Sequence, residues 1–474
     1  MKTIQEQDDF RSERLVFRIP GVPAMRLPIR LPKLTNPFST MVLLAYGFGA
    51  VILLGTILLM LPVSSQTGLV TPFLDALFTA TSAVCVTGLG VVDTGTYWST
   101  FGQAVLLVLI QIGGFGFITV TTIVLIAIGG KFGLRERLAV SESLGLERLS
   151  GILGVVIKIA IFSLIIESIG AALFYIQWLM MGQSGVSLWT AVFHAVSSFN
   201  NCGMDLFGNF NSLINYQTDS GTLLITAILI ISGSTGYIVV MEYTRKRNFF
   251  KLSLDSKMVL LVSFSLIVIG TLFYLVAEYA NHVTLGPLTF PQKLMVAFFQ
   301  SVSPRTAGFT AVDIGGLRQI SLFFTMFLMF IGGASGSAAG GIKVNTFGII
   351  ILTVIAALRG KSGIEAFGRQ VNRQIVYRAV TLVFIYLLTA CIVVTALSIT
   401  EIFPVDNLFF ETLSALSTVG LSAGITPGLS IAGRIIITLA MFIGRLGPLV
   451  LVTTLVKRQQ PVDIDYPNEN VRIG

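Results

Sequence analysis

The chain has 474 residues, of which 54% are hydrophobic and only 11% are charged, and its formal net charge is +8. A soluble domain carries roughly 25% charged residues, so this balance excludes an ordinary soluble protein. Apolar runs such as 38–62, 101–130 and 221–240 each reach the ~20 residues that a helix needs to cross a membrane. The composition therefore predicts an integral membrane protein with many spans.

Lys and Arg fall into clusters that are separated by apolar blocks. The clusters lie at 2–33, 131–148, 245–257, 359–378 and 457–458. Cytoplasmic loops of membrane proteins carry the excess of basic residues, so every cluster is expected inside. The chain must then cross an even number of times between clusters, and two spans per block give eight spans with both termini cytoplasmic. A scattered basic surface for nucleic acid does not explain why 59–130 and 159–244 contain no Lys or Arg at all.

Four similar segments recur along the chain. They read FTATSAVCVTG (78–88), FHAVSSFNNCG (193–203), FFQSVSPRTAG (298–308) and FETLSALSTVG (410–420), and each places a Phe ten residues before a Gly. A second landmark, rich in Ile and Gly, follows at 112–114, 231–233, 331–333 and 443–445. Self-similarity of this kind indicates one structural unit repeated along the chain. Each unit is expected to contain a membrane helix, a short re-entrant pore helix, a Gly-bearing loop and a second membrane helix.

The expected fold is an all-α integral membrane protein in which four such units surround one central pore. The division is a cytoplasmic segment 1–36, repeat 1 at 37–131, repeat 2 at 151–247, repeat 3 at 256–358, repeat 4 at 376–458 and a short cytoplasmic tail at 459–474. The pore loops are expected at 73–93, 187–205, 291–313 and 405–425. The three Cys are too few for a disulfide framework and suit free thiols.

The polar, Gly-bearing loops predict an ion filter. Irregular backbone at membrane depth is tolerated only where it is buried in protein or lines a water-filled cavity. Four loops around one axis can present a ring of carbonyls that replaces the hydration shell of a monovalent cation, and Gly supplies the positive φ that such a turn needs. Each short helix would aim its negative C-terminal end at the ion. The expected filter residues are Val86, Thr87, Gly88, Asn201, Cys202, Gly203, Thr306, Ala307, Gly308, Thr418, Val419 and Gly420.

Three acidic residues follow the filter glycines. Asp93, Asp205 and Asp313 lie on the side where basic residues are scarce. They can concentrate cations at the mouth of the pore. The alternative is that they cap helices or stand solvated in loops, and the sequence leaves both interpretations open.

The loops VCVTGL, SFNNCGMDL, SPRTAGFT and LSTVGLSAG resemble the filter loops of the Trk/Ktr/HKT superfamily of cation transporters. The resemblance covers essentially residues 37–458 and is closest to the Ktr-type membrane subunit. It implies K+ as the transported ion, pairing of subunits as a homodimer, and a separate cytosolic ring of nucleotide-binding subunits. The family's filter glycines map onto Gly88, Gly203, Gly308 and Gly420, and four glycines resemble the potassium-selective pattern. A sodium-permeable or Na/K cotransporting member, with Na+ as coupling or activating ion, is the alternative.

A gate is expected below the filter. Residues 332–341 read GGASGSAAGG, and five Gly give this run poor helix propensity, which favours a broken helix over a tight packing face. Arg445 stands within an apolar run, where a charge needs an interior cavity or a partner such as Glu411. The resemblance implies a flexible loop and a pore-facing Arg that close the pore together. The gate candidates are Gly332, Gly333, Gly336, Gly340, Gly341, Lys343 and Arg445, with Lys343 either part of the barrier or extended to the cytoplasm.

Other classes of function lack support. The chain has two His, His194 and His282, and no HExxH, GxSxG or Walker A motif, so we do not expect an enzyme. His194 is expected to pack on a pore helix. We expect a multi-pass protein of the cell membrane that contacts lipid, with 131–148 and 359–378 as candidate docking surfaces for a cytosolic partner.

Overall fold

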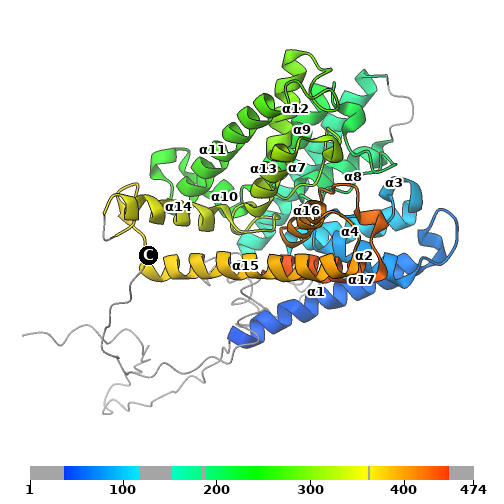
Figure 1. Cartoon of the computed structure of the whole chain (residues 1–474), viewed down its shortest axis with the longest axis horizontal. Coiled ribbons are helices and arrows are strands. Elements are labelled where there is room, and N and C mark those ends of the chain that lie inside the picture. The colour runs from blue at the N-terminus through cyan, green and yellow to red at the C-terminus, as the bar shows by residue number, and fades with distance from the viewer. Residues whose placement is uncertain (1–36, 117–151, 183–186, 361–362, 448–474) are drawn as a thin grey trace, which may run out of the picture.

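The computed structural model describes residues 37–116, 152–182, 187–360 and 363–447. Helices account for most of these residues, and the described sheet is one antiparallel hairpin of β1 (Glu365–Ala366) and β2 (Arg369–Gln370). The all-α prediction is therefore confirmed for the described chain. Figure 1 shows α17 (Ile431–Leu446) against α2 (Phe73–Val84), so the last quarter of the chain returns to the first.

Four long helices form the outer part of the fold. They are α1 (Pro37–Met60), α7 (Ile152–Met180), α11 (Leu254–Ala277) and α15 (Arg373–Thr400). Among the described residues, Gly154–Met180, Leu254–Ala277 and Arg373–Thr400 are long and apolar enough to cross a membrane. Large apolar side chains such as Phe264 and Phe384 stay exposed on them, as a lipid-facing surface requires. The prediction of eight spans is not tested by helix length alone and stays a prediction.

Each long helix packs against the short helix that follows it in the chain. The short helices are α2, α8 (Leu188–Phe199), α12 (Phe290–Val302) and α16 (Val405–Leu416). The residues at their N-termini favour the start of a helix. Pro72 and Pro404 directly precede α2 and α16. Ser187 caps α8, and Thr289 forms a capping box with Gln292 at α12. Their last turns are buried although they carry Ser and Thr, which marks them as interior elements of a polar site.

The second helix of every repeat ends or breaks at an equivalent place. These helices are α4 (Thr100–Phe115), α9 (Ser220–Ser234) with α10 (Tyr237–Lys246), α13 (Gln319–Phe330) with α14 (Val344–Leu358), and α17. Gly116, Gly236 and Gly447 have φ of 79°, 90° and 86°, with ψ between 129° and 140°. Residues other than glycine almost never adopt this backbone conformation. A break was expected only in repeat 3, and that expectation was incomplete.

The remaining elements are short and lie in the connections. They are α3 (Thr94–Tyr97) and the 3-10 turns η1 (Pro62–Ser64), η2 (Ile214–Tyr216), η3 (Phe249–Lys251), η4 (Ile314–Gly316) and η5 (Thr426–Gly428). The candidate docking stretch 131–148 lies outside the described residues. The 359–378 stretch is described except for 361–362 and contains the β1–β2 hairpin.

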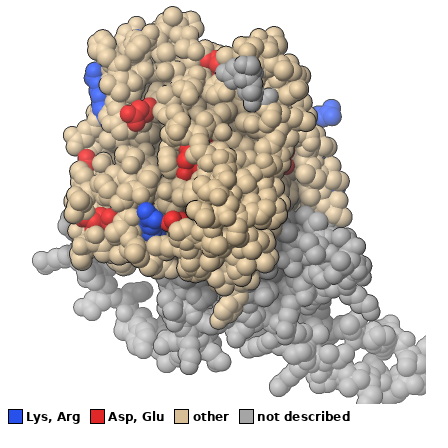
Figure 2. All heavy atoms as spheres, turned by 90° about the vertical axis from the view of Figure 1, so that its right-hand side faces the viewer, with Lys and Arg blue, Asp and Glu red and all other residues tan. Residues whose placement is uncertain are grey.

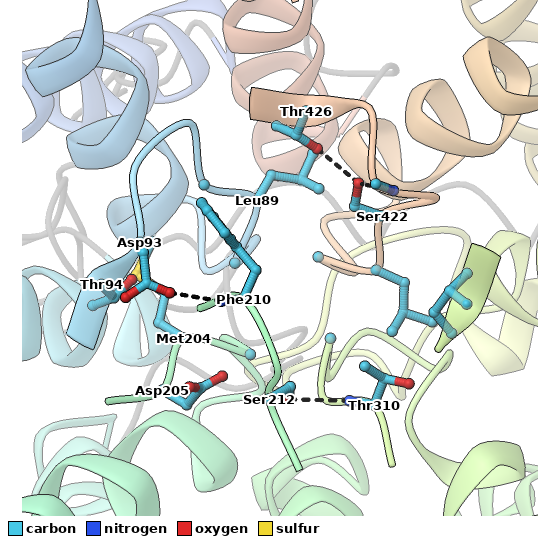
Figure 3. Close-up of a pocket in the computed structure, with 18 of the residues that line it drawn as sticks. Leu89, Asp93, Thr94, Met204, Asp205, Phe210, Ser212, Thr310, Ser422 and Thr426 are labelled. Carbon is cyan, nitrogen blue, oxygen red and sulfur yellow. Dashed lines mark hydrogen bonds between the residues drawn. The ribbon is translucent and has the colours of Figure 1, made fainter. Parts of the chain in front are cut away.

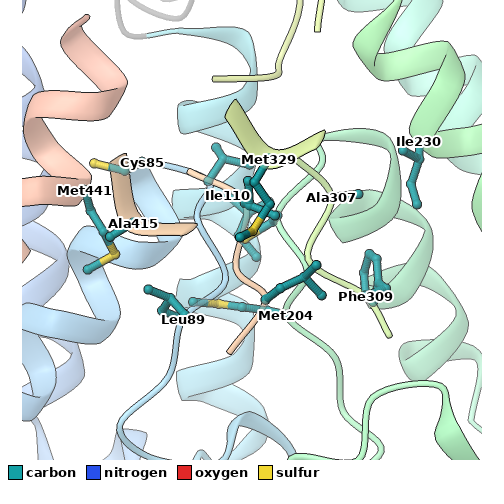
Figure 4. Close-up of a cluster of buried hydrophobic side chains, with 14 of the residues drawn as sticks. Cys85, Leu89, Ile110, Met204, Ile230, Ala307, Phe309, Met329, Ala415 and Met441 are labelled. Carbon is teal, nitrogen blue, oxygen red and sulfur yellow. The ribbon is translucent and has the colours of Figure 1, made fainter. Parts of the chain in front are cut away.

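The core gathers around the four Gly-bearing loops. Figure 4 shows Cys85, Met204, Ala307 and Ala415 close together, although they come from four different repeats. Cys85, Cys202 and Cys391 are free thiols, as the odd count predicted. The interior of the molecule is thus built from the loops that were singled out by sequence, with the long helices outside them.

Candidate functional site

The four loops share one backbone conformation. In each, the Gly and the residue two positions before it have positive φ, while the residue between them does not. The pairs are Val86 (56°) and Gly88 (91°), Asn201 (58°) and Gly203 (79°), Thr306 (74°) and Gly308 (77°), and Thr418 (51°) and Gly420 (95°). A β-branched residue at positive φ is a true outlier, and such strain persists only where surrounding structure enforces it. Three of the four loops accept it, which points to a functional requirement on the backbone.

The loops close into a ring, which we call the glycine ring and which comprises 86–88, 201–203, 306–308 and 418–420. A Cβ atom on any ring glycine would stand closer than 3.0 Å to the carbonyl oxygen that precedes the glycine of the next loop, a separation that real Cβ atoms essentially never show. Gly88 meets the carbonyl of Cys202, Gly203 that of Ala307, Gly308 that of Val419, and Gly420 that of Thr87. Only hydrogen fits at these four positions, and the fourth loop returns to the first.

The backbone N–H groups of the ring point away from its centre, toward the end of the preceding pore helix. The N–H before each ring glycine donates to a carbonyl of its own pore helix at 2.8–2.9 Å: Thr87 to Ser82, Cys202 to Ser197, Ala307 to Ser303 and Val419 to Ser414. Within the described residues, no hydrogen bond reaches the carbonyl oxygens of those four donors. Buried carbonyls are nearly always paired. Four of them without a protein donor form a set of oxygen ligands suited to a cation.

A cavity of about 260 Å³ lies next to the ring and is lined by residues of all four loops, including the four ring glycines (Figure 3). Asp93, Asp205 and Asp313 all line it. Each also accepts a local backbone hydrogen bond: Asp93 from Thr96 at 2.8 Å, Asp205 from Phe207 at 3.0 Å and Asp313 from Gly315 at 3.0 Å. These carboxylates therefore cap turns and also face the cavity, and their role in concentrating cations stays a prediction. Figure 2 shows isolated acidic side chains on a mostly uncharged face.

One residue of this cavity was missed by sequence analysis. Phe210 is 53% exposed and projects into the cavity, where its N–H donates to Asp93 at 2.7 Å (Figure 3). Its φ is 54°, and Gly208, Asn209 and Ser212 beside it also have positive φ. A bulky residue rarely adopts this conformation. Gly208, Asn209 and Asn211 beside it are turn-forming residues, and they are the feature of the sequence that could have indicated this irregular loop.

Residues 331–343 form an irregular segment, which we call the inner loop, pressed against the glycine ring. A Cβ atom on Gly340 would lie 2.8 Å from the carbonyl oxygen of Ser417 and would overlap the hydroxyl of Thr418. Repeat 2 holds the loop through three backbone bonds: Ala334 donates to Ser234 at 2.9 Å, Ala338 donates to Gly233 at 3.3 Å, and Tyr237 donates to Gly336 at 3.2 Å. Gly332, Gly333, Gly336, Gly340 and Gly341 all lie in it. The loop therefore contacts the ring at repeat 4 and is tied to repeat 2.

Arg445 connects the inner loop to the first repeat. Its guanidinium donates to the carbonyl of Ala338 at 2.6 Å and to that of Gly113. The alternative of an ion pair with Glu411 is wrong, because the Glu411 carboxylate accepts from Thr426 at 2.9 Å and from Ser422. Two backbone carbonyls accept from Arg445, and within the described residues no carboxylate pairs with its positive charge.

Two other basic residues lie in these segments: Lys343 ends the inner loop, and Arg305 directly precedes Thr306 of the glycine ring. Lys343 donates its ammonium proton to the carbonyl of Ala339 at 2.5 Å, so it folds back onto the inner loop and does not extend to the cytoplasm. Arg305 is 4% exposed and donates to the hydroxyl of Ser263 on α11 at 3.0 Å. It braces the third loop from behind. Each of the three basic side chains, those of Lys343, Arg305 and Arg445, therefore has different hydrogen-bond partners.

His194 is a packing residue. Its ring is 1% exposed and lies 4.8 Å from both Phe174 and Phe309, centroid to centroid. Its Nε2 atom lies 3.3 Å from the hydroxyl of Thr226. Within the described residues, no group of three or more His, Cys, Asp or Glu is placed to hold a metal ion.

A ring of backbone carbonyls inside a helical membrane fold is an arrangement typical of proteins that conduct ions. Residues 38–463 match the TrkH family, described as cation transport protein, and the chain belongs to this family. It is 41% identical over 437 residues to Ktr system potassium uptake protein B of Bacillus subtilis, which covers 92% of this chain and 97% of that protein. It is 38% identical to the potassium/sodium uptake protein NtpJ of Enterococcus hirae, over 94% and 100% of the two chains.

The fold is also similar to a solved structure. The potassium transporter TrkH from Vibrio parahaemolyticus matches with a TM-score of 0.71 and 18% identity, over 90% of this chain and 86% of that one. At that identity the likeness concerns the fold alone. The protein is thus a membrane cation transport protein of the TrkH family, and the resemblance inferred from the four loops is confirmed.

Proposed function

We propose that this protein is the pore-forming subunit of a potassium uptake system in the cell membrane. The observation that carries the proposal is the closed glycine ring, in which four carbonyls lack a protein donor and four missing Cβ atoms permit the close approach of neighbouring loops. The relatives named as potassium uptake proteins support K+ as the ion. Filter residues are the twelve residues of the ring, 86–88, 201–203, 306–308 and 418–420.

Selectivity arises from backbone geometry in this proposal. The ring residues before the glycines are Thr87, Cys202, Ala307 and Val419, whose side chains have little chemistry in common. Their carbonyl oxygens replace the hydration shell of K+, and the C-terminal ends of the four pore helices add negative potential. A substitution that adds a side chain at a ring glycine must therefore displace a ligand of the neighbouring repeat.

The inner loop and Arg445 form the gate. The loop stands against the inner side of the ring, and the guanidinium presents a positive charge between Ala338 and Gly113. Opening requires that the loop leave Arg445 and the 417–418 backbone. Repeats 1 to 4 supply two spans each, and both termini lie in the cytoplasm, so that the basic clusters face inward.

The names of the relatives also bear on the protein partners of this subunit. Relatives are named as members of a Ktr system, which supports a multi-component assembly with a cytosolic nucleotide-binding ring, and the subunit is expected to pair as a homodimer. The hairpin of β1 and β2 lies in the 359–378 stretch that we propose as one docking surface. The second candidate function is a sodium-permeable or Na/K cotransporting pore, because one relative is named a potassium/sodium uptake protein.

Cation uptake into liposomes that hold the purified protein tests the proposal, with K+, Rb+ and Na+ compared. Gly88→Ser is expected to reduce the preference for K+ over Na+ about tenfold, equivalent to about 1.4 kcal/mol, because its side chain meets the carbonyl of Cys202. Gly68→Ser is the matched control: φ at Gly68 is also positive (68°), but no atom lies within 4 Å of its Cβ position. Equal uptake of Na+ and K+ by the wild type, or an unchanged preference in Gly88→Ser, would reject the proposal.

A further inference from the structure

In repeats 2, 3 and 4, the residue three positions before the ring glycine ties its loop to the long helix of its own repeat. In repeat 3, Arg305 donates to Ser263 on α11 at 3.0 Å, and in repeat 4, Ser417 is bonded to Tyr386 on α15. In repeat 2, Asn200 donates to Glu167 on α7 at 3.0 Å. Of these three anchors, that of repeat 2 ends on a carboxylate.

Glu167 is enclosed in the middle of the helical bundle. It is 5% exposed, and its carboxylate accepts from Gln111 Nε2 at 3.0 and 3.2 Å and from Asn200 Nδ2 at 3.0 Å. Asn200 Nδ2 also lies 3.0 Å from Gln111 Oε1. These three side chains close a triangle that joins α4, α7 and the second loop, and so joins repeat 1 to repeat 2.

The approach of Asn200 to α4 depends on a glycine. A Cβ atom on Gly114 would overlap the Asn200 side chain. Gly114 belongs to the Ile-Gly-Gly landmark of repeat 1, whose repeat-2 counterpart is Ile231-Ser232-Gly233. This glycine therefore makes room for the triangle, which gives it a role beyond close helix packing.

A carboxylate at this depth is costly. Neither described salt bridge includes Glu167, and an ionisable side chain inside a membrane costs at least a few kcal/mol, which marks it as functional by default. Simple adhesion between α4 and α7 could be provided by neutral side chains. Oε1 of Glu167 accepts from both amides, and Oε2 accepts from Gln111 as well. An amide in its place would turn an NH2 group toward the Gln111 donor, which a carboxylate avoids because both of its oxygens accept.

Asn200 directly precedes the strained part of the second loop. It is the C-cap of α8, and the next residue, Asn201, has a φ of 58°. Cys202 follows, whose carbonyl faces Gly88 across the boundary between repeats. Fixing the Asn200 side chain therefore fixes where the ligand oxygens of 201–203 stand relative to the first loop.

We propose that Glu167 is a positioning residue for cation selectivity: through Asn200 and Gln111 it sets the place of the second filter loop. The proposal rests on the glycine ring being the selectivity filter. Glu167 does not touch the ion in this account, and its effect is transmitted by the two amides.

The test measures the K+/Na+ uptake ratio in liposomes together with the thermal unfolding midpoint in detergent. Glu167→Gln is expected to lower the ratio about tenfold, because an amide presents one acceptor in place of two. The double variant Gln111→Glu with Glu167→Gln returns a carboxylate to the triangle from the other helix and is expected to recover most of the ratio. Glu401→Gln is the matched control, since Glu401 accepts from Ser430 at the outer end of α15, away from the ring.

The outcomes separate this inference from the proposed function. Loss of the ratio in Gly88→Ser with an unchanged ratio in Glu167→Gln overturns the positioning role and leaves the filter proposal intact. A lowered midpoint with an unchanged ratio assigns Glu167 to stability alone, which also overturns it. A double variant no better than Glu167→Gln does the same, because recovery of the carboxylate would then have no effect. A wild type that does not prefer K+ rejects the filter proposal itself.

Discussion

The glycine ring and the layer next to it are built differently. In the ring, four loops with unlike side chains adopt the same sequence of φ signs and make the same contact with their neighbour. In the inner layer, the four second helices follow separate courses. Repeats 1 and 4 end their described helices at Gly116 and Gly447, repeat 2 bends by 93°, and repeat 3 unwinds over 331–343.

The difference follows from the functions that we propose for the two layers, a filter for the ring and a gate for the layer next to it. Ligands of one ion must be equivalent, so backbone geometry is repeated while side chains vary. A gate needs one element that can move and others that hold it, so equivalence is abandoned there. Arg445 makes this asymmetry concrete, because the landmarks of the other three repeats, at 112–114, 231–233 and 331–333, contain no charged residue.

The largest expected effect concerns Arg445. Two unit positive charges about 7 Å apart repel by about 2–3 kcal/mol at an effective dielectric constant of 20. Arg445→Gln also removes the donors to Ala338 and Gly113, so K+ flux into liposomes should rise at least about tenfold. Arg434→Gln, on the outer part of the same helix, should leave the flux unchanged. A flux in Arg445→Gln equal to that of the wild type would remove Arg445 from the gate.

The helix-ending glycines should show a smaller and uniform effect. Gly116→Ala and Gly447→Ala place a Cβ in open space but at φ of 79° and 86°, so each should cost roughly 1–3 kcal/mol of unfolding free energy through backbone strain alone. The measurement is the denaturant or thermal midpoint in detergent. Gly49→Ala, in α1 with nothing within 4 Å and no positive φ, should be neutral or stabilising. Tolerance of Ala at 116 and 447 would show that the helices need not end there.

The smallest effect is expected where the fourth repeat meets the first. Arg434 on α17 pairs with Asp75 on α2 at 2.6 Å, with side chains 24% and 18% exposed. Partly exposed pairs of this kind couple by about 1 kcal/mol or less. A double-mutant cycle with Arg434→Gln and Asp75→Asn, read as unfolding free energy, should give that coupling and should weaken at high salt. A coupling of zero would mean that helix packing alone closes the ring at this boundary.

Much of the site could be predicted because its signals are local and repeated. The constant spacing of ten residues between a Phe and a Gly located the four loops in the sequence. The positive φ at the four glycines could be expected, because glycine adopts it readily. The helix ends were missed because glycine has two uses in membrane helices. Gly113, Gly233 and Gly444 pack against pore-helix carbonyls, whereas Gly116, Gly236 and Gly447 end helices three residues later. Nothing in an apolar run distinguishes these uses without the coordinates.

The hydrogen-bond partners of buried charged side chains could not be predicted from the sequence either. Arg445 was matched with Glu411 because carboxylates are visible in a sequence, but its actual partners are two backbone carbonyls, which every residue has. The triangle of Gln111, Glu167 and Asn200 was likewise hidden, since its members are 33 to 89 positions apart and belong to three different helical elements.

The return of the fourth loop to the first has a consequence for how the protein is made. Gly420 must meet the carbonyl of Thr87, and Arg434 must meet Asp75, which is 359 positions earlier in the chain. Such distant contacts form late because loop closure must precede them. A ribosome-bound chain that has delivered only three repeats to the membrane therefore contains no finished ring. Under the proposed function, unfinished copies cannot present the complete set of cation ligands.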